Sequence, residues 1–226
     1  MNNTNKLTKL IDAERKAIQL FLEIEQRGLI CAHKTETALN KEIFELAFEL
    51  FDIKKYWHKR IVRAGKNTLL PYRENPENLI IKEDDILFFD FGPVFEDWEA
   101  DVGRTYVLGF NPLKLKLKND VELAWKEARN YYFNSEHLTG AQFYNYIAEL
   151  APKYGWEWAG PIGGHLIGNF PHETIQGEEI ENYIHPNNFK LMKDTDLNGL
   201  SREWILEIHF TNTDKQIGGF YEQLLV

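Results

Sequence analysis

The sequence predicts a single α+β domain, and three observations support this. Two segments with apolar residues at helical spacing come first, at residues 4–28 and 35–52. Short apolar runs typical of strands then alternate with further helical segments. No low-complexity linker divides the 226 residues, a length that suits one large domain or two small ones. Helices followed by strands mixed with helices favour one α+β unit.

Each of the two N-terminal helices carries one apolar face. In the first helix this face holds Leu10, Ala13, Ala17, Leu20, Phe21 and Ile24. We expect Gly28 to end this helix and Thr35 to cap the start of the second. The apolar stripe of the second helix consists of Leu39, Ile43, Ala47 and Leu50.

The middle of the chain changes to strands. Residues 66–79 hold two prolines and several turn formers, so we expect a loop there. Residues 86–91 and 105–108 are short apolar runs that predict strands, joined through Gly92 and Pro93.

The second half returns to helices and ends in strands. Its composition predicts helices over residues 117–134 and 140–153. Residues 159–172 hold four glycines and two prolines, which excludes a regular helix. Two closing strands are predicted at residues 204–210 and 219–226.

The charge balance and the termini exclude several classes of protein. With 26 basic and 35 acidic residues the formal charge is −9, which argues against a nucleic acid or an anionic membrane as the main partner. The N-terminus is polar, and no run of 18 apolar residues occurs, so neither a signal peptide nor a membrane span is expected. The single cysteine, Cys31, cannot form an internal disulfide. We therefore expect a soluble, cytoplasmic protein.

Four carboxylates lie in or beside apolar strand segments. Asp90 ends the run at 86–89, and Asp101 follows eleven residues later. Glu207 lies between two aliphatic residues, and Glu222 follows a tyrosine in the last strand. Any one of these acids is more often partly exposed or paired with arginine, because a buried unpaired carboxylate is costly. Four together suggest a shared site.

Two histidines extend this pattern. Glycines flank His165, which lets backbone approach it closely, and His172 follows seven residues later. An acidic site with one imidazole suits divalent Mn, Co, Fe or Zn. Four negative charges balance two such ions, which would lie ~3.5–4 Å apart and could activate a water between them.

The set of residues resembles metallopeptidase family M24, which includes methionine aminopeptidase, Xaa-Pro aminopeptidase (aminopeptidase P), prolidase and creatinase. In family order, the matching segments are Asp84–Gly92, Asp101–Thr105, Gly164–Gly168 with His172 and Glu173, Glu207 and Glu222. The eleven-residue and seven-residue steps also fit, and the resemblance covers roughly residues 10–226. It implies the pita-bread fold in one domain spanning 1–226, without the N-terminal domain found in creatinase and full-length aminopeptidase P.

The resemblance also implies a ligand set for two divalent metal ions. Asp90 would bind one ion, and Asp101 would bridge both. His165 and Glu207 would bind the second ion, and Glu222 would be a further bridge.

Catalytic and substrate-binding roles follow from the same resemblance. Glu207 would take a proton from the metal-bound water and pass it to the leaving amine. His172 would hydrogen-bond the scissile carbonyl or the tetrahedral oxyanion. Because residues two apart on a strand share a face, His209 points the same way as Glu207. From the residues alone, His209 is thus a candidate for contact with the substrate or with a metal-binding side chain, and the alternative is an exposed histidine at a strand edge.

The chain departs from the family pattern at several positions. The loop at residues 70–75 lacks the usual histidine, and Tyr72 is a candidate substitute because its hydroxyl can donate a hydrogen bond. Ile208 replaces the usual proline, while Phe220 and Gln223 stand where arginine and aspartate are usual. These changes alter the surroundings that tune a metal site, and they leave the substrate class open.

Three functions are compatible with these residues. The first is an aminopeptidase or dipeptidase that uses a metal-bridging hydroxide on short peptides. Its implied specificity is Xaa-Pro-like, because Asp-Phe-Gly-Pro at 90–93 and the Pro71-Tyr72 loop resemble the Xaa-Pro branch of the family. The second is a catalytically inactive module that binds peptide or protein. The third is a creatinase-like hydrolase of a C–N bond in a small molecule. The family resemblance also suggests a homodimer.

Overall fold

The computed structural model describes residues 3–172, 174, 179–196 and 199–226. In chain order, its elements are α1 (Asn3–Gln26), α2 (Glu36–Phe51), β1 (Ile61–Ala64), the 3₁₀ helix η1 (Gly65–Leu69), β2 (Ile86–Phe91), β3 (Val94–Phe95), β4 (Trp98–Glu99), β5 (Val102–Val107), α3 (Pro112–Asn134), α4 (Gly140–Tyr154), β6 (Glu157–Trp158), the 3₁₀ helix η2 (Glu179–Asn182), β7 (Ile205–Asn212) and β8 (Ile217–Leu224). Among these described residues, every helix is too short or too polar to span a bilayer.

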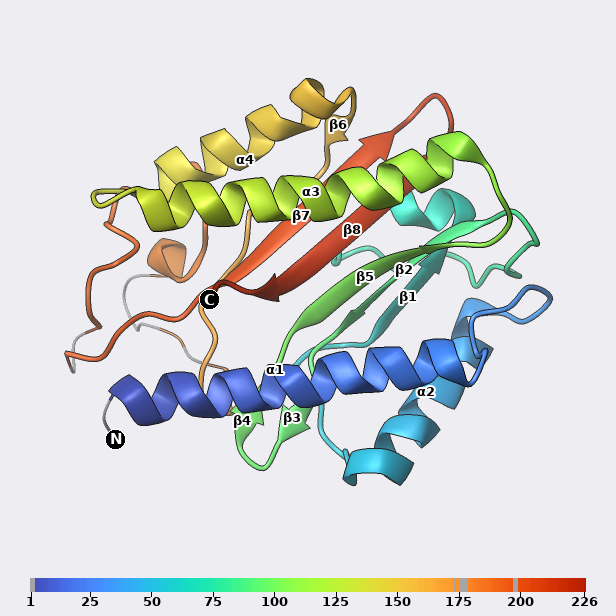
Figure 1. The fold of residues 1–226 in the computed structure, drawn as a ribbon, viewed down its shortest axis with the longest axis horizontal. Coiled ribbons are helices and arrows are strands. Elements are labelled where there is room, and N and C mark those ends of the chain that lie inside the picture. Colours follow the sequence, from blue (N-terminus) through green and yellow to red (C-terminus); the bar gives the residue numbers. More distant parts are fainter. Residues whose placement is uncertain (1–2, 173, 175–178, 197–198) are drawn as a thin grey trace.

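Six of the described strands form one antiparallel sheet in the order β1-β2-β5-β8-β7-β6 (Figure 1). The short strands β3 and β4 form a separate hairpin that connects β2 to β5. The expected α+β class is therefore confirmed, with β2, β5, β8 and β7 at the centre of the sheet.

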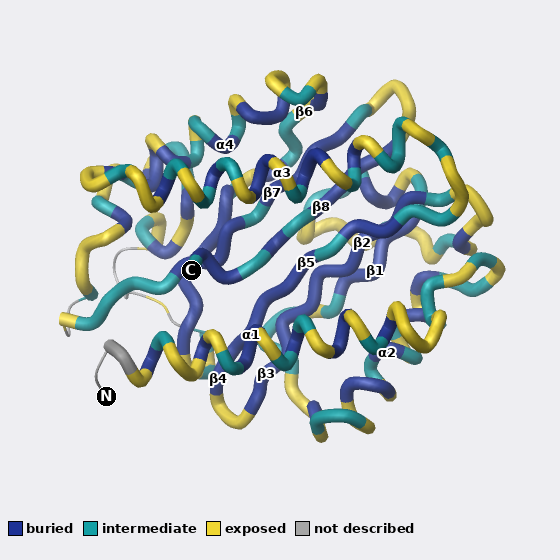
Figure 2. The backbone as a smooth tube through the Cα atoms, viewed as in Figure 1, coloured by how far each residue is buried: buried dark blue, intermediate teal, exposed yellow. Residues whose placement is uncertain are grey.

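The helices cover one face of the sheet, and the apolar residues of the strands point towards them. Side chains such as Phe89 on β2 pack with α1 and α2 in one core cluster. Side chains such as Phe210 on β7 pack with α3 and α4 in a second cluster. Figure 2 shows that the central strands are buried along most of their length. The opposite face of the sheet carries polar residues together with a small apolar cluster of Ile61, Phe88 and Phe220.

The helix boundaries follow local capping. The hydroxyl of Thr35 accepts a hydrogen bond from the backbone N–H of Ala38 at 3.1 Å, as predicted for an N-cap. Gly28 follows α1 with a φ of 64°, which is a left-handed conformation suited to glycine. Helix α3 begins at Pro112, five residues before the predicted start, because Asn111 caps it and proline suits the first turn.

The strand predictions were correct in place but not in every boundary. Strand β5 begins at Val102 rather than at 105, so it starts directly after Asp101. Residues 65–69 form η1 inside the segment expected to be a loop. Strand β1 was not predicted, because it is only four residues long and contains a charged residue, Arg63.

Candidate metal centre

The register of the sheet places three of the predicted acids in one row on the face opposite to the helices. Asp90 on β2 pairs with Gly103 on β5, Gly103 pairs with Glu222 on β8, and Glu222 pairs with Glu207 on β7. Asp101 lies two residues before Gly103, so its side chain is on the same face of the sheet, beside this row. Four residues far apart in sequence are therefore brought together by antiparallel pairing alone.

Gly103 makes this close approach possible. A Cβ atom at this position would lie 2.5 Å from the ring of Phe220 and 2.9 Å from the Cβ of Glu222. A larger residue would therefore push β8 away from β5 and separate the carboxylates.

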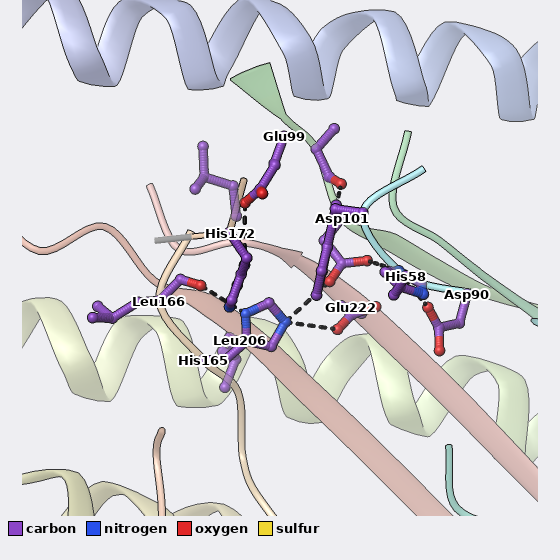
Figure 3. Close-up of polar contacts among 12 residues, drawn as sticks. His58, Asp90, Glu99, Asp101, His165, Leu166, His172, Leu206 and Glu222 are labelled. Atoms are coloured by element: carbon purple, nitrogen blue, oxygen red, sulfur yellow. Dashed lines mark hydrogen bonds and ion pairs between the residues drawn. The ribbon is translucent and has the colours of Figure 1, made fainter. Parts of the chain in front are cut away.

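His165 reaches the row from the irregular segment 159–172, where no helix forms, as predicted. Its backbone carbonyl accepts from the N–H of Ile205 at 2.8 Å. The preceding residue, Gly164, has a φ of 139°, and a side chain there would overlap the carbonyl of Ile205. The Nε2 atom of His165 lies 3.0 Å from Oδ2 of Asp101 and 4.0 Å from Oε1 of Glu222 (Figure 3).

His58 is a member of the cluster that sequence reasoning missed. Its Nε2 atom lies 3.2 Å from Oδ1 of Asp101 and 3.4 Å from Oδ1 of Asp90 (Figure 3). It comes from the segment between α2 and β1, outside the family motifs. The 70–75 loop lacks the histidine that is usual in the family, and His58 reaches the acids from a different segment.

Tyr72, the predicted substitute, lies beside His58 rather than in its place. Its hydroxyl accepts a hydrogen bond from the backbone N–H of Lys59 at 3.2 Å, and its ring centroid is 5.6 Å from that of His58. The residue is 44% exposed, so it lies at the rim of the cluster.

His172 lies next to the cluster and has two partners that the sequence did not indicate. Its Nδ1 atom is 3.1 Å from Oε2 of Glu99, a carboxylate that is fully buried. The indole of Trp57 stacks on the imidazole with a centroid distance of 4.5 Å and an interplanar angle of 7°. The ring centroid of His172 is 5.2 Å from that of His165. The neighbouring Glu173 of the family motif is outside the described residues.

His209 is buried, so the alternative of an exposed strand-edge histidine was wrong. Its Nε2 donates to the carbonyl of Thr68 at 2.9 Å, and its ring packs against Phe88 and Phe220. Burial lowers its pKa to about 4, which keeps the ring neutral at pH 7. Its role as a substrate contact stays a prediction.

The cluster perturbs the pKa values of its own members. Burial, together with the neighbouring carboxylates, raises the pKa of Glu207 to about 8 and that of Glu222 well above its usual value. Although burial opposes the change, Asp90 and Asp101 raise the pKa of His58 to about 9. Burial raises the pKa of Asp101, but His58 and His165 outweigh it and lower that pKa to about 2. The acids repel one another, and positive charge at the histidines compensates only part of this.

The donor atoms fit divalent cations. Within the described residues, two groups of three side chains each bring one donor atom per residue within 4.8 Å of one another: His58, Asp90 and Asp101, and Asp101, His165 and Glu222. The Oε2 atom of Glu222 is buried and has no hydrogen-bond partner among the residues that the structure describes. A cation would supply both the missing partner and the missing positive charge. Oxygen donors with imidazole nitrogen are the ligands of Mn, Co, Fe or Zn.

A model of metallopeptidase family M24 matches residues 6–196, which is most of the chain. This chain belongs to metallopeptidase family M24. A segment of 57 residues is also 37% identical to a Mycoplasma genitalium protein named for Xaa-Pro aminopeptidase, a match that covers 25% of this chain and 16% of that protein.

Solved structures show the same fold for the M24 chain. A prolidase from Thermococcus sibiricus superposes with a TM-score of 0.79 and 21% identity, over 98% of this chain and 56% of that one. An X-Pro aminopeptidase from Thermotoga maritima gives a TM-score of 0.77 and 19% identity, over 99% and 61%. The pita-bread fold is therefore confirmed, and the chain spans little more than half the length of these two solved proteins.

The M24 residues named from sequence all lie at or around one site. Asp90, Asp101, His165 and Glu222 belong to the two donor groups. Glu207 is in neither group, but it is directly opposite Glu222 in the sheet.

Proposed function

We propose that this M24 chain is a metal-dependent exopeptidase that removes residues from the N-terminus of short peptides, with Xaa-Pro-like specificity. One observation carries the proposal: side chains from β2, β5, β7, β8 and the 159–172 segment converge on one buried, strongly acidic cluster. A cluster of this kind is costly to bury without cations, so a folding role alone does not explain it.

The residues that would hold two divalent ions are Asp90, Asp101, His165, Glu207 and Glu222. Divalent ions in such a site polarise a carbonyl and lower the pKa of the water that they bind. Because the donor set mixes carboxylates with imidazole, Mn, Co, Fe and Zn all suit it.

The chain's own groups would position the peptide and move the proton. Glu207 would take a proton from the attacking water and return it to the leaving amine, which needs a carboxyl group that can hold a proton near neutral pH.

His172 would stabilise the negative charge that develops on the scissile carbonyl oxygen. Its Nδ1 faces Glu99, so Nε2 is the atom left for the substrate. Stacking on Trp57 holds the ring in place. The proposed substrate contacts are the Tyr72 hydroxyl at the rim of the site and the buried His209.

Two alternatives remain as outcomes of the same assay. A binding module that has lost catalysis would bind peptide without hydrolysing it, but it has no need to keep every candidate ligand. A C–N hydrolase of small molecules would keep the ions and fail on all peptides. The names of the solved relatives, prolidase and X-Pro aminopeptidase, favour a peptide whose second residue is proline.

Hydrolysis of a panel of Xaa-Pro and other dipeptides and tripeptides tests the proposal. The protein should be inactive after chelation and dialysis and active once Mn²⁺ or Co²⁺ is returned. Asp101→Asn should abolish the activity, because Nε2 of His58 and Nε2 of His165 both contact this carboxylate. Asp97→Asn, an exposed acid in the β3–β4 hairpin, is the matched control and should stay active. Full activity of the metal-free protein would refute the proposal.

A further inference from the structure

We propose that His58 is an additional metal ligand, which gives the cation at Asp90 and Asp101 a nitrogen donor. The inference rests on the proposed metal centre and adds to it a residue outside the M24 motifs. Its consequence is a centre with one imidazole at each end, His58 at one and His165 at the other, and Asp101 between them.

The tautomer of His58 is fixed by the backbone. Its Nδ1 lies 2.7 Å from the carbonyl oxygen of Lys59, and a carbonyl can only accept, so Nδ1 carries the hydrogen. In the neutral ring Nε2 therefore presents a lone pair. This lone pair faces carboxylate oxygens of Asp90 and Asp101, which are also acceptors. Three acceptors that converge in a buried place need a cation or a proton between them.

His165 shows the same arrangement at the other end of the site. Its Nδ1 donates to the carbonyl of the next residue, Leu166, at 2.8 Å, and its Nε2 faces Asp101 and Glu222. Asp101 gives Oδ1 to His58 and Oδ2 to His165. A hydrogen bond from Nδ1–H to a carbonyl oxygen is how proteins orient imidazoles that bind a metal through Nε2.

The distances suit a shared cation. Two donors that are each about 2.1 Å from one ion, at angles of about 90–110°, lie about 3.0–3.4 Å from each other. The Nε2 atom of His58 is 3.2 Å from Asp101 and 3.4 Å from Asp90. The imidazole nitrogen is therefore spaced from each carboxylate as two ligands of one ion are, and the donor atoms of all three residues lie within 4.8 Å of one another.

The protein holds His58 rigidly in this position. The N–H of Trp57 donates to the carbonyl of Gly92 at 3.0 Å, and the N–H of Val94 donates to the carbonyl of Lys55 at 3.1 Å, which pairs the segment with the end of β2. A side chain at Gly92 would overlap the ring of His58. The His58 side chain is only 7% exposed. This packing fits a preorganised ligand better than a mobile proton carrier.

Titration of the metal-free, full-length chain with Zn²⁺ or Co²⁺ tests the inference. The wild type should bind two ions. His58→Ala should weaken the binding of one ion at least about tenfold, and His58→Gln should do the same if alanine fails to fold. His172→Ala, which removes a neighbouring histidine with no proposed metal contact, should leave both affinities unchanged.

A second readout observes the ring nitrogens directly. On addition of Zn²⁺, the ¹⁵N resonances of Nε2 in His58 and His165 should both shift, while those of the exposed His33 should not. If two ions bind to the His58 variants with wild-type affinity, or if the His58 resonance does not move, the inference is wrong while the proposed function stands. If the wild type binds no ion, the proposed function fails as well.

Discussion

Glu99 is fully buried, and in the part of the chain that the structure describes only one of its two carboxylate oxygens has a hydrogen-bond partner. That partner is Nδ1 of His172, so Glu99 helps to hold the orientation of the imidazole. Neither residue type nor spacing distinguishes Glu99 from other acids in the sequence. Its role depends on the β3–β4 hairpin, which brings it beneath the 159–172 segment.

Glu99→Gln should therefore lower kcat/KM roughly tenfold to a hundredfold, because the imidazole loses the charged partner that orients it. Glutamine keeps an oxygen that can accept from Nδ1 but lacks the charge. Metal content should not change, which separates this effect from damage to the centre. A kcat/KM equal to that of the wild type would contradict the assigned role.

Glu14 on α1 is a second buried acid, remote from the substrate side of the sheet. Its Oε2 accepts from the N–H of Leu224 at 2.9 Å, and burial raises its pKa to about 7 from a usual 4.5. Between these two pH values the folded protein keeps a proton that the unfolded chain has lost. The free energy of unfolding therefore falls as pH rises through this window and levels off above about pH 7.

Glu14→Gln should remove this penalty. The variant's free energy of unfolding, taken relative to that of the wild type, should be up to about 3 kcal/mol higher at pH 8 than at pH 4. Glutamine can still accept the hydrogen bond from the N–H of Leu224. Urea denaturation of the metal-free protein at several pH values measures it. Glu45→Gln, at an exposed position on α2, should show no such trend. A difference between variant and wild type that is independent of pH would contradict the prediction.

At the scale of elements, the approach of β5 and β8 at Gly103 decides whether the acids meet. Gly103→Ala should destabilise the protein by about 1–3 kcal/mol, because the new methyl group overlaps the Phe220 ring. It should also weaken metal binding, since Glu222 would move with β8. Shortening the clashing side chain in Gly103→Ala/Phe220→Leu should recover part of both losses. Unchanged metal affinity in Gly103→Ala would show that this contact does not set the site.

The elements themselves were largely predictable from sequence, because apolar periodicity marks helices and strands that bury one face. Strand β1 escaped prediction because it is short and polar at its flanks. The start of α3 escaped because Lys114, Lys116 and Lys118 resemble a surface patch, although Asn111 and Pro112 mark the N-terminus of the helix.

The site was predictable only where a motif exists. Asp90, Asp101, His165, Glu207 and Glu222 were named because their order and spacing resemble a family pattern. His58 was not, since it reaches the acids through pairing of its segment with residues 92–94, a tertiary contact that no local pattern reports.

At the scale of the whole molecule, the cluster links metal binding to stability. Without cations the sheet holds several carboxylates close together, and ions that bind only the folded state stabilise it by mass action. At a free concentration one hundred times its Kd, one ion contributes about 2.7 kcal/mol, which for a chain of this size corresponds to a rise in Tm of about 5–10 °C. Thermal unfolding before and after chelation measures this, and Asp101→Asn should lose most of the rise. An equal Tm in both states of the wild type would contradict it.

The number of ions bound per chain is the most direct test of the account. Elemental analysis of protein reloaded with Mn²⁺ or Co²⁺ and freed of excess metal should find close to two ions in the wild type and markedly fewer in Asp101→Asn. A correctly folded wild-type chain that retains no divalent ion would contradict the assignment of these side chains to a metal centre.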